Sequence, residues 1–217
     1  ASGGTEITDG DNKYHVFTSP GTFSVLTGDK SKFDILVIGG GGGGAGNNSG
    51  GGGAGGLVYI PQPVSFPITG SEPISVGGGG EGRPDNSQNG SNGSNSTLGS
   101  LLTAIGGGGS TAWTNPAPTP SQNGGSAAGG SGTPTGNPSA FTNAGSALQP
   151  TQPGNSGTYG HGSDAGRGGR SSGDTGAAGG GGAGGSSSNV PSPGNEGGTV
   201  GTDGGAGYSA PAFPGPV

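Results

Sequence analysis

The residues of this chain that most resemble a chemical motif form a literal GxGxxG pattern, which cradles a pyrophosphate in dinucleotide-binding folds. The pattern consists of Gly39, Gly41 and Gly44, directly after an apolar, strand-like run. That chemistry needs a helix after the glycines and an acidic residue about 20 positions further on. More glycine, asparagine and serine follow instead, and no acid occurs between Asp34 and Glu72. Because any run of six glycines contains this pattern by accident, we do not expect nucleotide binding.

The other candidate motifs are also incomplete. Arg167–Arg170 is a single RGG-like copy in an acidic chain, which favours loop or helix-surface arginines over an RNA contact. Asp9–Asn12 offers oxygen ligands but lacks the twelve-residue calcium-loop pattern, which favours a solvated turn. Neither His15, expected on a strand, nor His161, either a ligand contact or a spacer, has metal or triad spacing. We therefore expect no catalytic residue, cofactor, metal or enzymatic activity.

Four asparagines begin an N-x-S/T sequon, which makes them candidate glycosylation acceptors. In a chain rich in asparagine and serine, several such matches arise by chance, and glycosylation also requires a suitable cell. The four residues are Asn47, Asn89, Asn92 and Asn95.

Glycine is spread evenly along the 217 residues, but apolar bulk is not. Val, Ile, Leu, Phe, Tyr and Trp number 34, and 26 of them lie at or before Trp113. A net charge of −6 argues against nucleic acid and anionic membrane surfaces, and the absence of cysteine excludes disulfides. No apolar run is long enough to span a membrane. The start at Ala1, without a signal-peptide pattern, suggests a mature or trimmed piece of a longer protein.

The apolar segments read as β-structure, with turns between them and no helical periodicity. Prolines in the middle of the chain predict edge strands or extended loops there. The expected strands cover 13–18, 22–25 and a more fully buried 33–38, followed by apolar pieces at 57–60, 74–76 and 98–105.

Glycine tracts alternate with polar segments throughout the chain. In isolation such tracts are typical of flexible linkers, and ordering each glycine costs about 0.5–1 kcal/mol more than ordering alanine. An ordered form favours left-handed polyglycine II helices, which have three residues per turn and no internal hydrogen bonds. Side-by-side packing would then pair their backbone groups laterally. The glycines expected to build this scaffold include Gly39, Gly41, Gly44, Gly51, Gly78, Gly107, Gly180 and Gly184.

The expected fold is thus an all-β N-terminal part plus a bundle or sandwich of polyglycine II helices, with essentially no α-helix. Three regions are expected to form one continuous domain. They are an N-terminal β-strand region at 1–38, mixed strands and glycine tracts at 39–113, and a glycine-rich bundle with Pro/Ser/Asn-rich loops at 114–217.

Several motifs, taken in order, resemble the glycine-rich domain of bacteriophage tail-fibre and adhesin proteins. The resemblance implies a host-recognition tip, in which stacked polyglycine II helices form a rigid sandwich and loops at its distal end bind a cell-surface receptor. The chain departs from the family pattern in two short tracts, 124–125 and 129–130, and in the proline-rich loops 111–123 and 133–156. The motifs that carry the resemblance are Lys13–Phe23, Asp34–Gly40, Ile74–Gly78, Asn92–Gly99, Ala104–Gly109 and Gly179–Gly185.

Receptor contacts are expected on loops that a rigid scaffold holds. Aromatic side chains are common at interaction hot spots, although each could instead pack on the scaffold or on a neighbouring subunit. The candidates are Trp113, Phe141, Tyr159, His161, Tyr208 and Phe213.

The expected function is that of a non-enzymatic tail-fibre tip or adhesin on the virion surface, or otherwise extracellular. Its partners would be a bacterial surface protein or glycan, together with other copies of itself or a fibre shaft. The alternative is a structural subunit of an extracellular fibril or a capsid decoration. Ice binding is disfavoured because the loops lack a regular threonine or alanine face.

Overall fold

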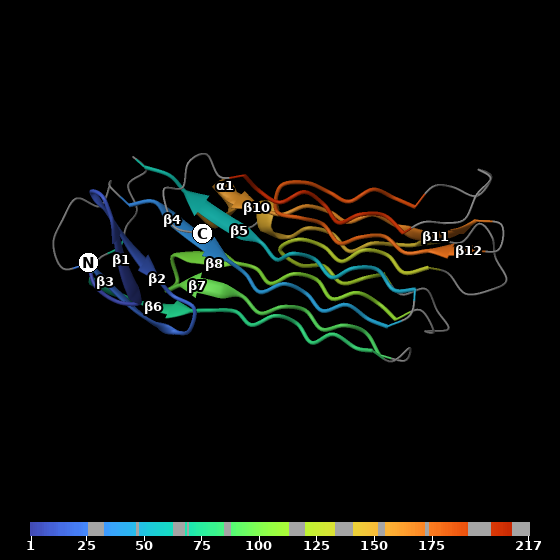
Figure 1. The fold of residues 1–217 in the computed structure, drawn as a ribbon, viewed down its shortest axis with the longest axis horizontal. Helices are drawn as coiled ribbons and strands as arrows, with labels where there is room; N and C mark the ends of the chain where they lie inside the picture. Colours follow the sequence, from blue (N-terminus) through green and yellow to red (C-terminus); the bar gives the residue numbers. More distant parts are fainter. Residues whose placement is uncertain are drawn as a thin grey trace.

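The computed structural model describes residues 1–25, 33–46, 48–62, 68, 70–84, 88–112, 120–132, 141–151, 155–171, 174–190 and 201–209. Strands gather at one end of an elongated molecule, and glycine tracts run from them along its length (Figure 1). Among the described residues, no helix is long and apolar enough to cross a membrane. The strands are β1 (Thr5–Asp9), β2 (Asn12–Val16), β3 (Gly21–Val25), β4 (Ile35–Ile38), β5 (Leu57–Ile60), β6 (Gly70–Ser75), β7 (Ser96–Leu98), β8 (Leu102–Ala104), β9 (Phe141–Thr142), β10 (Gly160–His161), β11 (Gly168–Ser171) and β12 (Asp174–Gly176).

The strands pair into small antiparallel sheets. A β1–β2 hairpin adjoins a four-stranded sheet ordered β3-β6-β7-β8 and a three-stranded sheet ordered β10-β5-β4. A second three-stranded sheet, β12-β11-β9, lies at the opposite end of the molecule (Figure 1). Helical structure among the described residues amounts to a 3₁₀ turn, Gln149–Thr151, and the four-residue helix α1, Asn155–Thr158. This confirms the prediction of a chain with essentially no α-helix.

The hydrophobic core lies between the two sheets at the strand-rich end. Alternation along β3 and β8 turns apolar side chains to one face, and neighbouring half-buried aromatic rings complete the cluster. Every buried member of this cluster lies before Ile105 in the sequence, in agreement with the concentration of apolar residues in the first half of the chain. The buried members are Val25, Val58, Ile60, Ile68, Leu98, Leu102 and Ala104.

Three strand expectations were incomplete or wrong. β4 was expected to be well buried, but Ile38 is 55% exposed because the strand runs out of the core into a glycine tract. β1 was not foreseen, because its alternation is weak. Pro73 lies inside a strand with neighbours on both sides, rather than on an edge strand. It is tolerated because β7 pairs only with Ile74 and Ser75, which leaves β3 as the neighbour of Pro73.

Beyond the strands, extended tracts lie side by side and are joined by backbone hydrogen bonds. In tract 39–44, amides three residues apart donate to the same neighbour, and the next pair donates to a different one. The bonds run from Gly39 and Gly42 to the carbonyl oxygens of Gly56 and Gly53, and from Gly40 and Gly43 to those of Ser94 and Ser91, with N···O distances of 2.8–3.0 Å.

The carbonyl groups of the same tract show the same spacing of three. Gly107 and Ser110 donate to positions 40 and 43, while Gly80 and Arg83 donate to positions 41 and 44. One tract therefore bonds to four neighbouring segments. This repeat differs from the two-residue alternation of a β-strand and from the bonding within a single segment of an α-helix.

Many tract glycines leave no room for a side chain. A Cβ at Gly39, Gly107, Gly180 or Gly184 would overlap the carbonyl oxygen of a neighbouring tract, and one at Gly51 would lie 3.0 Å from a backbone nitrogen. The surroundings of the other expected scaffold glycines are more open. A Cβ at Gly41 would meet carbonyl oxygens only at 3.7 Å, and at Gly44 and Gly78 no atom lies within 4 Å.

Gln149 joins the strand-rich end to the glycine tracts. Its side chain is fully buried. The amide oxygen accepts a hydrogen bond from the Ile105 amide at 2.7 Å, and its nitrogen donates to the Thr103 carbonyl oxygen at 3.1 Å. The Gln149 side chain thus gives the Ile105 amide and the Thr103 carbonyl oxygen their hydrogen-bond partners. These two bonds also satisfy the buried side-chain amide itself, as is usual for a buried polar group.

Candidate functional site

The described ends of the tracts, which flank the connections between tracts, gather mainly at the end of the molecule opposite the hydrophobic core (Figure 1). The described residues that flank them there include Gly46, Pro84, Ala112, Gly132 and Val190. The connections themselves, at 47, 85–87, 113–119, 133–140, 172–173 and 191–200, lie outside the described residues. We call this end the distal end.

Backbone pairing reaches the distal end. Gly132 donates to the Asn48 carbonyl oxygen at 2.7 Å, and β11 pairs with both β9 and β12. Arg83 and Glu81, near the end of tract 76–84, form an ion pair at 2.9 Å. The distal end is therefore tied together across tracts that are far apart in sequence.

The six expected contact residues do not all lie together. Trp113 and Phe213 fall outside the described residues, and Phe141 belongs to β9 at the distal end through its backbone. Tyr159 packs against the hydrophobic core at the strand-rich end. His161, in β10 beside β5, and Tyr208, which contacts His161, are both half-buried at the strand-rich end.

His161 and Tyr208 stack on each other. The ring centroids are 3.9 Å apart and the ring planes differ by 24°. His161 is held in β10, which pairs with β5, whereas Tyr208 belongs to the tract 201–209. The stack therefore fastens the end of this tract to the sheet. Burial lowers the pKa of His161 from its ordinary value, which favours the neutral ring.

A carboxylate network lies on the same sheet. Tyr59 of β5 donates its hydroxyl to Asp34 Oδ1 at 3.1 Å. The backbone amide of Gln62 donates to the same oxygen, and its side-chain amide donates to Oδ2 at 2.7 Å. Burial, with the adjacent Asp34, raises the pKa of Tyr59. Both carboxylate oxygens are thus occupied by partners within the chain, so the group holds structure in place.

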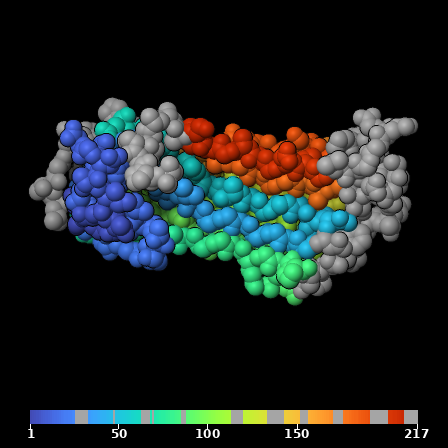
Figure 2. All heavy atoms as spheres, viewed as in Figure 1, coloured from blue at the N-terminus to red at the C-terminus, as the bar shows by residue number. Residues whose placement is uncertain are grey.

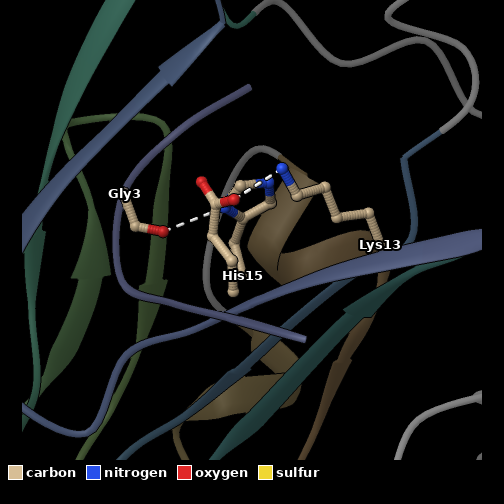
Figure 3. Close-up of polar contacts among 4 residues, drawn as sticks. Gly3, Lys13 and His15 are labelled. Carbon is tan, nitrogen blue, oxygen red and sulfur yellow. Dashed lines mark hydrogen bonds and ion pairs between the residues drawn. The ribbon is translucent and has the colours of Figure 1, made fainter. Parts of the chain in front are cut away.

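His15 is likewise occupied by its own fold, as expected for a histidine on a strand. Its Nδ1–H donates to the Gly3 carbonyl oxygen at 2.9 Å (Figure 3). Its ring packs edge-on against Phe23, with ring centroids 5.3 Å apart. Glu6 lies between His15 and Lys13, and its ion pair with Lys13 measures 2.5 Å. The hydrogen bond from Lys13 lowers the pKa of Glu6. Asp9–Asn12 forms the turn of this hairpin, as predicted.

A shallow polar groove of about 400 Å³ lies between the last two tracts, which form part of the upper edge in Figure 2. Ser186–Ser188 line one side and Gly201–Gly204 the other. Thr202 Oγ1 donates to the Ser188 carbonyl oxygen across the groove at 2.9 Å. Thr202 also bonds to the wall behind the groove, because its amide donates to the Ala177 carbonyl oxygen and its Oγ1 accepts from the Gly179 amide.

Three of the four sequon asparagines have a structural role that sequence reasoning missed. Each accepts a backbone hydrogen bond on Oδ1 from tract 105–112. The donors are the amides of Ala112 for Asn89, Gly109 for Asn92 and Gly106 for Asn95, at 2.9, 2.7 and 2.9 Å. The signal was present in the sequence as the three-residue repeat of 89–95, NGSNGSN. Asn47 lies outside the described residues.

Among the described residues, no group of three or more His, Cys, Asp or Glu side chains could hold a metal ion. No curated protein and no solved structure matches the chain. A family model described as a glycine-rich domain matches residues 18–216, so the chain belongs to that family.

Proposed function

We propose that this chain is a non-enzymatic receptor-binding domain of a phage tail fibre or adhesin, exposed on a virion surface or otherwise extracellular. Its glycine tracts act as a rigid polyglycine II scaffold. The connections at the distal end contact a bacterial surface protein or glycan.

The three-residue spacing of the lateral hydrogen bonds supports the polyglycine II assignment. A left-handed helix with three residues per turn presents each backbone amide in one of three directions, so residues i and i+3 face the same neighbour. Tract 39–44 has this pattern on both its amides and its carbonyls. In the described tracts, positive φ values occur at Asn48, 51°, and at Gly55, 90°. The negative φ of the other tract residues agrees with the left-handed form.

The observation that carries the receptor-binding proposal is that the described tract ends flanking six connections gather at one end of a laterally bonded bundle. Binding residues are commonly found on loops with varied side chains that a rigid scaffold holds in position. The tracts provide the support, since a Cβ at their interior glycines would overlap a neighbouring backbone. The connections provide the varied polar and aromatic residues.

A loop exchange tests this function. Residues 133–140 would be replaced by a Gly/Ser segment of equal length. The exchange stops at residue 140, because Phe141 and Thr142 form β9. Adsorption of the carrier particle to its bacteria should fall at least tenfold, while the melting temperature stays unchanged. Asp11→Ser, in the β1–β2 turn at the opposite end, is the control and should adsorb normally. Normal adsorption of the exchanged variant, and of equivalent exchanges at 113–119 and 191–200, would refute the proposal.

A structural subunit is the second candidate, and one observation favours it. Gly44, Gly78, Gly79 and Gly82 are exposed, and their amides have no hydrogen-bond partner among the described residues. Such an open face resembles an unpaired sheet edge, which can accept another chain. Light scattering of the purified chain distinguishes the candidates. A concentration-dependent assembly that Gly79→Arg abolishes supports the subunit, and a monomer at all concentrations contradicts it.

A further inference from the structure

The asparagine repeat contains two Asn-Gly dipeptides, Asn89-Gly90 and Asn92-Gly93. Asn-Gly is the dipeptide most exposed to deamidation, because glycine has no side chain to hinder the attack and moves freely in an open chain. The backbone nitrogen of the glycine attacks Cγ of the asparagine, and a new C–N bond closes a five-membered succinimide. The side-chain nitrogen leaves as ammonia and takes up the proton that the glycine nitrogen loses. One water molecule then opens the ring to aspartate or isoaspartate.

In the folded chain, both reacting groups of each dipeptide are engaged elsewhere. The attacking nitrogen of Gly90 donates to the Ser110 carbonyl oxygen and that of Gly93 to the Gly107 carbonyl oxygen, both at 2.9 Å. The amide oxygen beside each Cγ accepts from tract 105–112, from Ala112 in the first dipeptide and from Gly109 in the second.

The surroundings of the two glycines hold this geometry in place. A Cβ at Gly90 would overlap the Gly43 carbonyl oxygen, and one at Gly93 would overlap that of Gly40. Their backbones are therefore pressed against tract 39–44 on one side and bonded to tract 105–112 on the other. Rotation of the glycine nitrogen toward Cγ requires the tract to separate from both neighbours.

We propose that Asn89 and Asn92 are deamidation sites that are closed in the bundle and open only when tract 88–95 separates from it. The fraction of chains deamidated at these two positions then increases with the total time that the tract has spent separated from the bundle. Isoaspartate carries one additional backbone carbon, which displaces the three-residue repeat on which both sets of lateral bonds depend. A tract altered in this way cannot regain its register, so the damage makes unfolding irreversible.

The test measures deamidation in the whole chain at pH 8 and 37 °C by peptide mapping with mass spectrometry. A synthetic peptide covering residues 86–97 supplies the unprotected rate. We expect Asn89 and Asn92 to deamidate at least 100-fold more slowly in the folded chain than in the peptide. When the chain is unfolded by urea, both should deamidate at the rate measured in the peptide. Asn95, which precedes Ser96 instead of glycine, is the internal control and should react slowly in every sample.

Hydrogen exchange provides an independent measure of the opening. The ratio of folded to peptide deamidation rates should match the opening equilibrium obtained from the amides of Gly90 and Gly93 under the same conditions. Deamidation in the folded chain at the peptide's rate, or far above the measured opening, would overturn the proposal. Asn92→Asp keeps an oxygen at the acceptor position and should fold, which separates the effect of the charge from that of isoaspartate.

Discussion

The two ends of this molecule reach order by different physical routes. At the strand-rich end, side chains such as Ile60 and Leu102 are removed from water between two sheets. Along the tracts, backbone contacts backbone, and most buried residues are glycine, alanine or serine, such as Ala127 and Ser126. A hydrophobic core tolerates changes that keep volume and polarity. A backbone-bonded bundle tolerates almost no substitution at glycines that face its interior, but it accepts substitutions at glycines that face solvent.

The largest effect should come from a side chain placed inside the bundle. In Gly107→Val, the new Cβ would meet the Gly53 carbonyl oxygen, and neither backbone can move without breaking lateral bonds. We expect the bundle not to assemble, with a destabilisation above about 3 kcal/mol. Circular dichroism and thermal melting provide the measurement.

Gly78→Ala is the matched control for this substitution. The position is exposed and open, and its φ is not positive. Alanine there should be neutral or stabilising by about 0.4–1 kcal/mol, because it restricts the unfolded chain. Equal losses of stability in Gly107→Val and Gly78→Ala would remove the distinction between inward and outward positions.

Leu102→Ala should weaken the hydrophobic end. Leu102 is 1% exposed within the core cluster, and deleting its methyl groups should cost about 2–5 kcal/mol. Urea unfolding monitored by aromatic fluorescence tests this value. If the two ends are energetically distinct, hydrogen exchange should show faster opening of β7 and β8 than of the distal tract ends. Uniform acceleration along the whole chain would instead show one cooperative unit.

A smaller loss is expected in Asn92→Ala, which removes a side-chain acceptor at the border of the bundle. The buried amide of Gly109 then loses its partner, at a cost of about 1–3 kcal/mol. Asn92→Asp keeps the oxygen and should recover most of the stability. A Gly109 amide that exchanges at its original rate in Asn92→Ala would show that the bond contributes nothing.

The smallest effect concerns pH at the His161–Tyr208 stack. Burial lowers the folded pKa of His161 below its ordinary 6.5, so the stack contributes its full stability above pH 6.5. That contribution should decline as the pH falls from 6.5 through the folded pKa. The difference in melting temperature between the natural chain and His161→Phe should therefore change between pH 8 and pH 5. A constant difference across this range would show that His161 does not titrate with folding.

Much of the strand-rich end could be predicted from sequence, because alternation and apolar runs report burial directly. The segments 22–25 and 57–60 were placed within one residue, and the hairpin turn at Asp9–Asn12 was recognised. The strands β9, β11 and β12 were not predicted, because their extended form depends on pairing with neighbouring strands and not on their own polar and glycine-rich residues. The three-residue period of the asparagine repeat is visible in the sequence. Its role in accepting hydrogen bonds became clear only once the structure showed that tract 105–112 lies beside it.

The sequence by itself determined where side chains are absent, where apolar bulk accumulates and that asparagine recurs every third residue. These are properties of each segment alone. Only the tertiary structure decided which tracts are neighbours, because glycine segments carry no side chains that distinguish one partner from another. It likewise decided that Phe141 lies at one end while His161 and Tyr208 stack at the other. In a bundle joined mostly by identical backbone groups, partner choice depends on chain connectivity, on the lengths of the turns and on the few side chains, such as that of Asn92, that bond to a neighbouring tract.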